Sequence, residues 1–373
     1  MAAALRAGIE GSFAHWEAVP DLDFAAAFDV SVMEMMESPN RLVYDVVVQR
    51  LLALLRNGHT TFRDRWLETG PGRPFGVALR PLGGRWTVTR SVRDQLPVGS
   101  VVTAVDGQTI TDALAERRRF LCASSDRAAE MALFRNTQLF PDEIVLRTES
   151  GAEVRLDKGD HPAPWPGFPT IAPARGCSLL RLRSFSDEMY ESTALSELDG
   201  LDSDAPLLID LRGNGGGNTP LGLLERLMDR PYRLWRSSVS ETNSLARAHE
   251  QPPAIVTFPS KLNEPALRAH KGRIVLVVDA TVGSAAEDFV MPFKDNGRAL
   301  IVGETTSGSS GQPHLLFLGE EMTARIGAKR ESFPDGSPFE GIGIVPDLAV
   351  DTTPEDLAAG RDPALLAAIE AIA

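Results

Sequence analysis

Three short stretches of the sequence place residues that can do chemistry at the ends of predicted elements. In the first, Ser284 stands between an apolar run and a helix-like stretch, with small neighbours on both sides. This placement is typical of a serine nucleophile whose hydroxyl stands clear at a turn and whose following N–H points toward an oxyanion. The alternative is structural, because Ser284 and Glu287 also have the spacing of a capping box at a helix start.

The second stretch contains His59, which directly follows a helix-stop pair, Asn57-Gly58, and leads into two threonines. A neutral imidazole, with a reference pKa of ~6.5, can accept the proton of a serine hydroxyl near pH 7. The alternative is that His59 is a structural or surface residue. No histidine has the spacing of a metal site, and Cys122 and Cys177 form no CxxC pair, so the sequence predicts no metal.

The third stretch is the glycine-rich run 210–217, which begins with Asp210 and Arg212 and directly follows an apolar run. Four glycines in five residues lose much conformational entropy on folding. Such a run is typical of places where backbone amides must approach another group closely. No Lys-Ser or Lys-Thr pair follows, so the run is not a P-loop. A flexible loop is the alternative.

The elements that must position these stretches change in kind along the chain, which predicts three units. Residues 1–72 are predicted to be helical, with apolar residues at three- and four-residue steps over 44–56. Residues 73–160 contain short alternating runs typical of strands. In residues 161–373, after a proline-rich linker at 161–166, apolar runs alternate with helical stretches, which is typical of an α/β core whose strands are covered on both faces.

The predicted strands of the middle unit are 76–80, 86–89, 100–105, 108–110, 144–147 and 153–156. In the C-terminal unit the predicted strands are 179–182, 206–211, 273–279 and 299–302, and the predicted helices are 192–198, 220–228 and 285–296. Ser284 and the glycine-rich run both follow a predicted buried strand, at the edge where α/β folds bind their ligands.

The composition narrows the class of protein. Lys plus Arg number 38 and Asp plus Glu 51, a formal charge of −13 with no basic cluster, so nucleic acid is excluded as an expected partner. No apolar stretch is long enough to span a membrane, and the first ten residues carry charges where a signal peptide needs an apolar run. We therefore expect a cytoplasmic protein, or a periplasmic or secreted one if a leader has been trimmed.

Taken together, the motifs resemble those of the tail-specific proteases, the C-terminal-processing serine peptidases, over residues 40–350. The run 210–217 is similar to the family's DLRxNxGG, 283–287 to its SAxE, 303–308 to its GExTxG and 340–347 to its EGxGVxPD. The resemblance implies a ClpP/crotonase-like α/β core, no cofactor, a peptide or unfolded protein as substrate, and a fold compatible with oligomers. The middle unit, with Asp106-Gly107 at a hairpin turn, resembles a PDZ module.

One position separates the branches of this family. The Ser/Lys branch has a lysine 25 residues after the nucleophile, and this chain has Ser309 there. Residues 57–60 resemble instead the branch of the tricorn core protease and the interphotoreceptor retinoid-binding protein modules. That resemblance implies His59 as the base and Glu340 as the end of a relay, with a serine before the histidine; here Gly58 takes the place of that serine.

The resulting hypothesis is a serine peptidase with Ser284 as nucleophile, His59 as general base and Glu340 orienting the imidazole. The oxyanion hole is predicted at the N–H groups of Ala285 and Gly216. Asp210 and Arg212 are predicted to brace the glycine loop. Two alternatives stay open: a catalytically silent family member that binds an apolar ligand or a partner, and an acyl-CoA enzyme of crotonase-like architecture.

Overall fold

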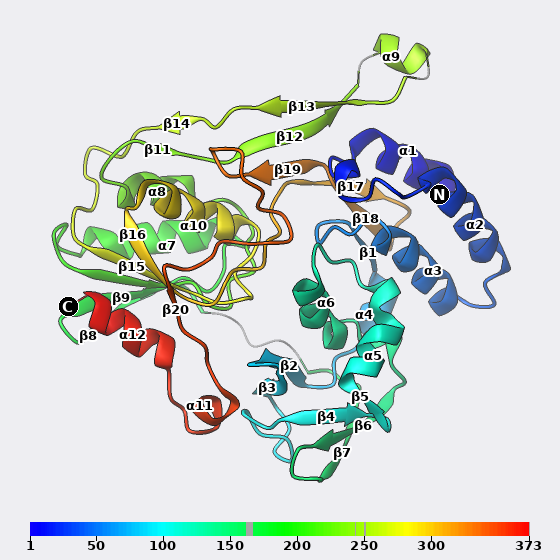
Figure 1. The fold of residues 1–373 in the computed structure, drawn as a ribbon, viewed down its shortest axis with the longest axis horizontal. Coiled ribbons are helices and arrows are strands. Elements are labelled where there is room, and N and C mark those ends of the chain that lie inside the picture. Colours follow the sequence, from blue (N-terminus) through cyan, green and yellow to red (C-terminus); the bar gives the residue numbers. More distant parts are fainter. Residues whose placement is uncertain (162–166, 243, 250, 373) are drawn as a thin grey trace.

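The computed structural model describes residues 1–161, 167–242, 244–249 and 251–372, so most of the predicted linker, 162–166, lies outside the described residues. Figure 1 shows the N-terminal helices on one side of the molecule, a strand-rich middle unit (residues 75–157) below them, and a C-terminal α/β core on the other side. Among the residues that the structure describes, no helix is long and apolar enough to cross a membrane.

The N-terminal region is helical, as predicted. It consists of α1 (Ala2–Ser12), a 3₁₀ turn at Trp16–Ala18, α2 (Phe24–Glu37) and α3 (Arg41–Ala53). Helix α3 begins before the predicted start because the Asn40 side chain accepts the N–H of Val43. It also ends earlier, and the left-handed residue behind it is Arg56 (φ 47°) rather than Asn57 or Gly58, which corrects the predicted stop.

These helices pack on a small sheet made from both ends of the chain. Strand β1 (Thr61–Asp64) pairs with β18 (Met322–Gly327), which pairs in turn with β17 (Pro313–Phe317), all antiparallel. Ala324 and Ile326 of β18 belong to the same buried apolar cluster as the N-terminal helices. The N-terminal region is therefore joined to the C-terminal part of the chain, and the residues just before β1 are held against it.

The middle unit has its own apolar cluster, drawn from residues 75–156. All six predicted strands are confirmed, as β2 (Val77–Leu82), β3 (Arg85–Ser91), β4 (Val102–Val105), β5 (Gln108–Thr109), β6 (Glu143–Thr148) and β7 (Glu153–Asp157). Helices α5 (Ile110–Arg117) and α6 (Asp126–Ala132) were not predicted, nor were the 3₁₀ turns Arg118–Phe120, Leu133–Arg135 and Thr137–Leu139. Both α-helices are short and begin at a side-chain cap, Thr109 and Ser125.

The C-terminal core is the predicted α/β unit. Its six-stranded sheet has the order β20-β16-β15-β10-β9-β8 and is parallel except at β8. The strands are β8 (Thr170–Ala174), β9 (Cys177–Arg181), β10 (Leu207–Asp210), β15 (Ile274–Val278), β16 (Ala299–Gly303) and β20 (Leu348–Ala349). The apolar runs predicted at 179–182, 206–211, 273–279 and 299–302 correspond to β9, β10, β15 and β16.

Helices cover both faces of this sheet, as the continuous apolar runs predicted. Helices α7 (Glu188–Asp199), α8 (Leu221–Leu227) and α10 (Ala285–Asn296) share one buried cluster with alternate residues of the strands, among them Ile209 and Leu276. Helix α12 (Pro363–Ile372) packs with the other set, among them Leu208 and Val275. Because β10 and β15 are parallel neighbours, their carboxyl ends lie at the same edge of the sheet.

An extension of the core was not predicted. It consists of β11 (Tyr232–Arg233), β12 (Arg236–Glu241), α9 (Ser244–Ala248), β13 (Ala254–Phe258), β14 (Leu262–Asn263) and β19 (Lys329–Ser332). Two short helices lie elsewhere: α4 (Arg65–Thr69) follows β1 within the predicted helical region, and α11 (Pro354–Ala358) contacts β3. Strand β12 pairs with β13 and β19 in a second small sheet, and Figure 1 shows α9 at the far tip of the β12–β13 ribbon.

Candidate active site

Ser284 lies at the sharp turn between β15 and α10. Its φ of 53° is in the left-handed region, which a residue other than glycine adopts only at a cost, and such strain is concentrated at functional sites. The backbone N–H of Ser284 contacts the carbonyl of Ser309 (2.9 Å) and the carboxylate of Glu287 (3.2 Å). Ser284 therefore begins helix α10, as the structural alternative predicted. Its hydroxyl contacts His59.

His59 meets that hydroxyl. Its Nε2 atom lies 3.2 Å from Ser284 Oγ, although the two residues are 225 positions apart in the chain. The backbone that carries His59 is fixed by Asn57, just before β1. Asn57 Oδ1 accepts hydrogen bonds from the backbone N–H of His59 (3.1 Å) and from the Thr60 hydroxyl (3.0 Å). The structure thus brings together the two residues that the sequence singled out separately.

The other ring nitrogen of His59 contacts a hydroxyl that was not predicted to take part. His59 Nδ1 lies 2.9 Å from Ser309 Oγ, and Ser309 Oγ donates to Glu340 Oε1 at 3.3 Å. Because Ser309 has only one proton to donate, donation to Glu340 leaves its oxygen to accept from Nδ1–H. Nε2 is then the unprotonated nitrogen, free to accept the Ser284 proton.

Glu340 ends this chain of contacts and is held by residues from three parts of the molecule. Its Oε1 atom also accepts from Ser124 Oγ (2.5 Å) and Asn57 Nδ2 (3.1 Å), while among the described residues Oε2 is buried without a partner. Burial raises the pKa of Glu340 to about 7. The carboxylate predicted to orient the imidazole is therefore linked to it through Ser309 and not by direct contact.

Gly58 explains why the hydroxyl comes from Ser309. A Cβ atom at position 58 would lie 2.8 Å from Ser309 Oγ, too close for an undistorted side chain. The Gly58 N–H donates to Ser124 Oγ at 2.9 Å, so the backbone here is held against the middle unit. The hydroxyl that the resemblance implied at position 58 is thus supplied by Ser309, 25 residues after Ser284.

The surroundings keep His59 neutral. Burial lowers the pKa of His59 to about 4, and the charges of Arg325 and Lys329 lower it further, whereas Asp288 opposes the shift. A neutral imidazole is the form that can accept a proton.

The glycine-rich run lies beside Ser284, as its place at the end of β10 predicted. Gly216 has φ 98°, and a Cβ atom there would approach Ser284 Cβ and the carbonyl of Gly283, both at 2.7 Å. The N–H of Ala285 has no acceptor among the described residues. The N–H of Gly216 donates to Asn214 Oδ1 (2.9 Å), so of the two predicted oxyanion donors only Ala285 is open in this state.

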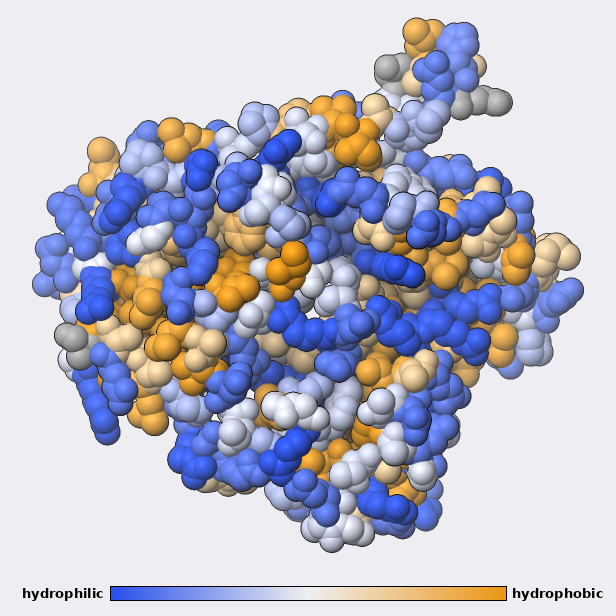
Figure 2. Space-filling model, in the orientation of Figure 1, coloured by the Kyte–Doolittle hydropathy of each residue, from blue (hydrophilic) through white to orange (hydrophobic). Residues whose placement is uncertain are grey.

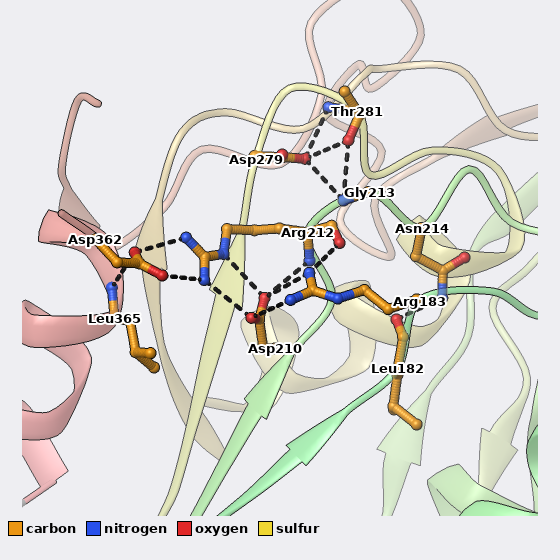
Figure 3. A network of polar contacts seen from close by, with 10 residues as sticks. All are labelled: Leu182, Arg183, Asp210, Arg212, Gly213, Asn214, Asp279, Thr281, Asp362 and Leu365. Carbon is orange, nitrogen blue, oxygen red and sulfur yellow. Dashed lines mark hydrogen bonds and ion pairs between the residues drawn. The ribbon is translucent and has the colours of Figure 1, made fainter. Parts of the chain in front are cut away.

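Asp210 and Arg212 hold the base of the glycine-rich run (Figure 3). The buried Asp210 carboxylate accepts from the Arg212 side chain (2.9 Å twice) and from Arg183 Nη2 (2.8 Å). Arg212 also donates to both oxygens of Asp362, just before α12, at 2.7 and 2.8 Å. These contacts can brace the loop, because they join it to Asp362 at the start of α12, the helix on the other face of the sheet from α10.

Ser284 and His59 open into a cavity of about 780 Å³, lined by residues of the N-terminal region, the middle unit and the core. Figure 2 shows this face of the molecule hollowed near its centre, with mainly hydrophilic residues around the hollow. In the described part of the chain no His, Cys, Asp and Glu side chains gather into a group able to hold a metal ion.

Comparison with known proteins shows which family the C-terminal part of the chain resembles. Residues 176–350 match the model of peptidase family S41. This stretch therefore resembles an S41 peptidase domain. That domain contains Ser284, Ser309 and Glu340, whereas His59 lies outside it. The family resemblance predicted from the four motifs is thereby confirmed; the branch within the family stays a prediction.

Two curated proteins are similar to part of the chain. The chain is 23% identical over 178 residues to a carboxy-terminal-processing protease of Bartonella bacilliformis and 26% identical over 181 residues to a carboxyl-terminal-processing protease of Synechocystis. These matches cover 46% and 48% of this chain but only 38% and 39% of the relatives.

Two solved structures share the fold over nearly their whole length. Mature CPAF complexed with lactacystin superposes with a TM-score of 0.72 at 16% identity, covering 100% of this chain and 96% of that one. The photosystem II D1 C-terminal processing protease superposes with a TM-score of 0.55 at 19% identity, covering 99% and 95%. The predicted α/β fold class is confirmed by these matches.

Proposed function

We propose that this protein is a serine peptidase that cleaves peptide bonds through an acyl-enzyme on Ser284, with His59 as general base. The observation that carries the proposal is the 3.2 Å contact between His59 Nε2 and Ser284 Oγ, beside an amide with no acceptor at Ala285. The family of residues 176–350 and the names of the relatives, both processing proteases, support peptides or unfolded proteins as the substrate.

The contacts supply each proton transfer of the reaction. As Ser284 Oγ bonds to the peptide carbonyl carbon, its proton passes to His59 Nε2. The Nδ1–H group of His59 keeps its hydrogen bond to Ser309 Oγ during this transfer. The oxyanion that forms accepts from the Ala285 N–H. His59 then gives its proton to the leaving amine as the C–N bond breaks. In the second half His59 takes a proton from the water that attacks the ester, and gives it to Ser284 Oγ as the acyl C–O bond breaks and the acid is released.

Glu340 counters the charge that appears on the imidazole. When ionised, its carboxylate favours the imidazolium through the Ser309 hydroxyl, in the way that the aspartate of a Ser-His-Asp triad does by direct contact. Gly216 can be the second oxyanion donor only by exchanging Asn214 for the oxyanion, because its N–H is already donated.

Active-site labelling tests this proposal. A fluorophosphonate probe should modify the wild-type protein and fail to modify Ser284→Ala or His59→Ala, since the first lacks the nucleophile and the second its base. Ser192→Ala, which removes an exposed hydroxyl on α7, is the matched control and should label normally. A wild-type protein that resists the probe would favour the alternative, a silent family member that binds an apolar ligand or a partner.

A further inference from the structure

The cavity at Ser284 is lined by positive charge, although the protein as a whole carries −13. Four cationic side chains line it, Arg127, Arg135, Arg325 and Lys329, and Asp288 is the one carboxylate among the described lining residues. A cleft lined by one sign of charge concentrates ligands of the opposite sign, even on a protein whose net charge repels them.

Arg127 and Arg135 come from one face of the middle unit. They are eight residues apart, with Met131 midway and also in the lining, so the three form a stripe along α6 and the 3₁₀ turn after it. Arg127 donates only to main-chain carbonyls, among them Thr305 (3.3 Å) and Ile342 (3.0 Å). Arg135 donates through Nε to the Met131 carbonyl (2.7 Å).

Arg325 faces the cavity from another wall. In the β1-β18-β17 sheet it pairs with Thr61 on one side and Leu315 on the other, and all three line the cavity. Its neighbours Ala324 and Ile326 point the opposite way, into the apolar cluster of the N-terminal helices. Strand alternation therefore fixes Arg325 toward the space beside His59.

Three of these cations have no acidic partner. Within the described residues, Arg127, Arg135 and Arg325 make no ion pair, whereas Lys329 is paired with Glu331 at 2.6 Å. Asp288 makes no ion pair with them within the described residues, and its carboxylate accepts instead from Trp235 Nε1 (2.9 Å) and from the hydroxyls of Thr219 and Ser310 (both 2.6 Å). The cavity is thus lined by arginines that have no acidic partner in the described ranges of the chain.

We propose that these guanidinium groups select peptides with Asp or Glu side chains close to the bond that is cleaved. This inference rests on the proposed function and names its substrate class. A guanidinium holds a carboxylate with two parallel hydrogen bonds, a stronger and more specific contact than it makes with a neutral amide. The cations come from two separate walls, so they suit side chains along a peptide better than the single carboxylate at its end.

The test is a binding measurement that does not depend on cleavage. Two pools of acetylated, amidated and rhodamine-labelled decapeptides, identical except that Gln replaces every Glu in one, are titrated with Ser284→Ala and followed by fluorescence anisotropy. We expect the Glu pool to bind about tenfold more tightly, since charge-assisted hydrogen bonds are about twice as strong as neutral ones. The preference should fall to about twofold when Arg325→Gln or Arg135→Gln is added.

The matched control is Arg273→Gln, which removes the same charge from an exposed residue just before β15, outside the cavity, and should leave the preference unchanged. Partial unfolding of a variant weakens both pools together and leaves their ratio, so the ratio is the readout. Equal binding of the two pools overturns the inference, as does a preference that survives both cavity changes.

The same experiment separates this inference from the proposed function. A protein that prefers the Glu pool but resists the fluorophosphonate probe and cleaves neither pool would overturn the peptidase assignment and leave a carboxylate-binding cavity. A protein that reacts with the probe and cleaves both pools, with no preference between them, would support the peptidase assignment and overturn the inference that acidic peptides are its substrates.

Discussion

At the scale of single residues, the candidate site depends on one hydroxyl reaching the space between an imidazole and a carboxylate. Ser309 supplies it, and Gly58 leaves the room that it needs. The assignment of the imidazole tautomer follows from this arrangement, because the single proton of Ser309 goes to Glu340. Ser309 is therefore a positioning residue, which acts through His59.

The first prediction concerns this hydroxyl. Ser309→Ala should lower kcat by about 10- to 100-fold, a part of the ~10²–10⁴ that general base catalysis contributes, with little change in KM. The loss is expected because Nδ1 then has no acceptor and the ring no fixed tautomer. Peptidase kinetics measure it, and Ser309→Thr, which keeps the hydroxyl, should recover most of the rate.

A paired substitution gives the control. Gly58→Ser should damage the site because its Cβ would meet Ser309 Oγ, whereas Gly58→Ser combined with Ser309→Gly should be more active than either single variant. Losses that simply add in the double variant would show that the two positions do not share one space.

The second prediction is a two-step dependence of kcat/KM on pH. Burial sets the pKa of Glu340 at about 7 and that of His59 at about 4. As pH falls below 7, Glu340 becomes protonated and neutral, so activity should fall part of the way; below about 4, His59 itself becomes charged, and activity should vanish. Glu340→Gln should give low activity without the step near 7. A single step near 6.5 in both proteins would contradict this account.

At the scale of elements, the glycine-rich run shows how backbone shape makes room for the nucleophile. Gly216 has a left-handed φ and lies against the turn that holds Ser284, so any side chain there must displace that turn. Gly213, in the same run, is also left-handed (φ 83°) but has nothing within 4 Å of its Cβ direction. The two positions carry similar strain and differ in their neighbours.

The third prediction uses that difference. Gly216→Ala should lower kcat by about 10²-fold or more, because Ser284 and the oxyanion donors depend on this turn. Gly213→Ala should cost about 1–3 kcal/mol of unfolding free energy through strain alone and keep the activity of its folded fraction. Urea unfolding and kcat, measured on both variants, separate the two effects; equal kcat values would show that the close approach of Gly216 does not matter.

The fourth prediction concerns the brace below the loop. Asp210→Asn leaves Arg183 and Arg212 beside a buried amide and should cost about 3–5 kcal/mol, since it breaks a buried ion pair. Asp362→Asn removes a half-exposed partner of Arg212 and should cost about 1 kcal/mol or less. Chemical denaturation measures both, and similar costs would show that the buried position gives Asp210 no special weight.

The elements of the core could be predicted because its strands are continuous apolar runs with helices between them. Ser284 and His59 could be picked out by residue type and by their position near the end of an element, whereas Glu340 could be named only through the family motif that it begins. The parts that were missed are held by contacts across long stretches of chain, as Ser124 and Asn57 on Glu340 show. No local pattern marks Ser124, whereas the position of Ser309 was noticed only for the lysine that it lacks.

At the scale of the whole molecule, the candidate site is assembled from three regions that have separate apolar clusters. The N-terminal region provides His59, the middle unit provides Ser124, and the core provides Ser284 and Glu340. Contacts between regions keep them in register, among them the ion pair of Arg80 in the middle unit with Glu304 in the core, at 2.6 Å. Residues 176–350, which match the S41 family, therefore lack the imidazole that Ser284 contacts.

The exchange between Gly58 and Ser309 has a consequence for how such enzymes are found. If either position can supply the bridging oxygen, yet steric overlap forbids both at once, the two should vary together among homologues: a small residue at one wherever the other bears an alcohol. Surveys that require a serine in front of the histidine would then discard competent peptidases as degenerate, and a filter accepting one alcohol at either place would retain them.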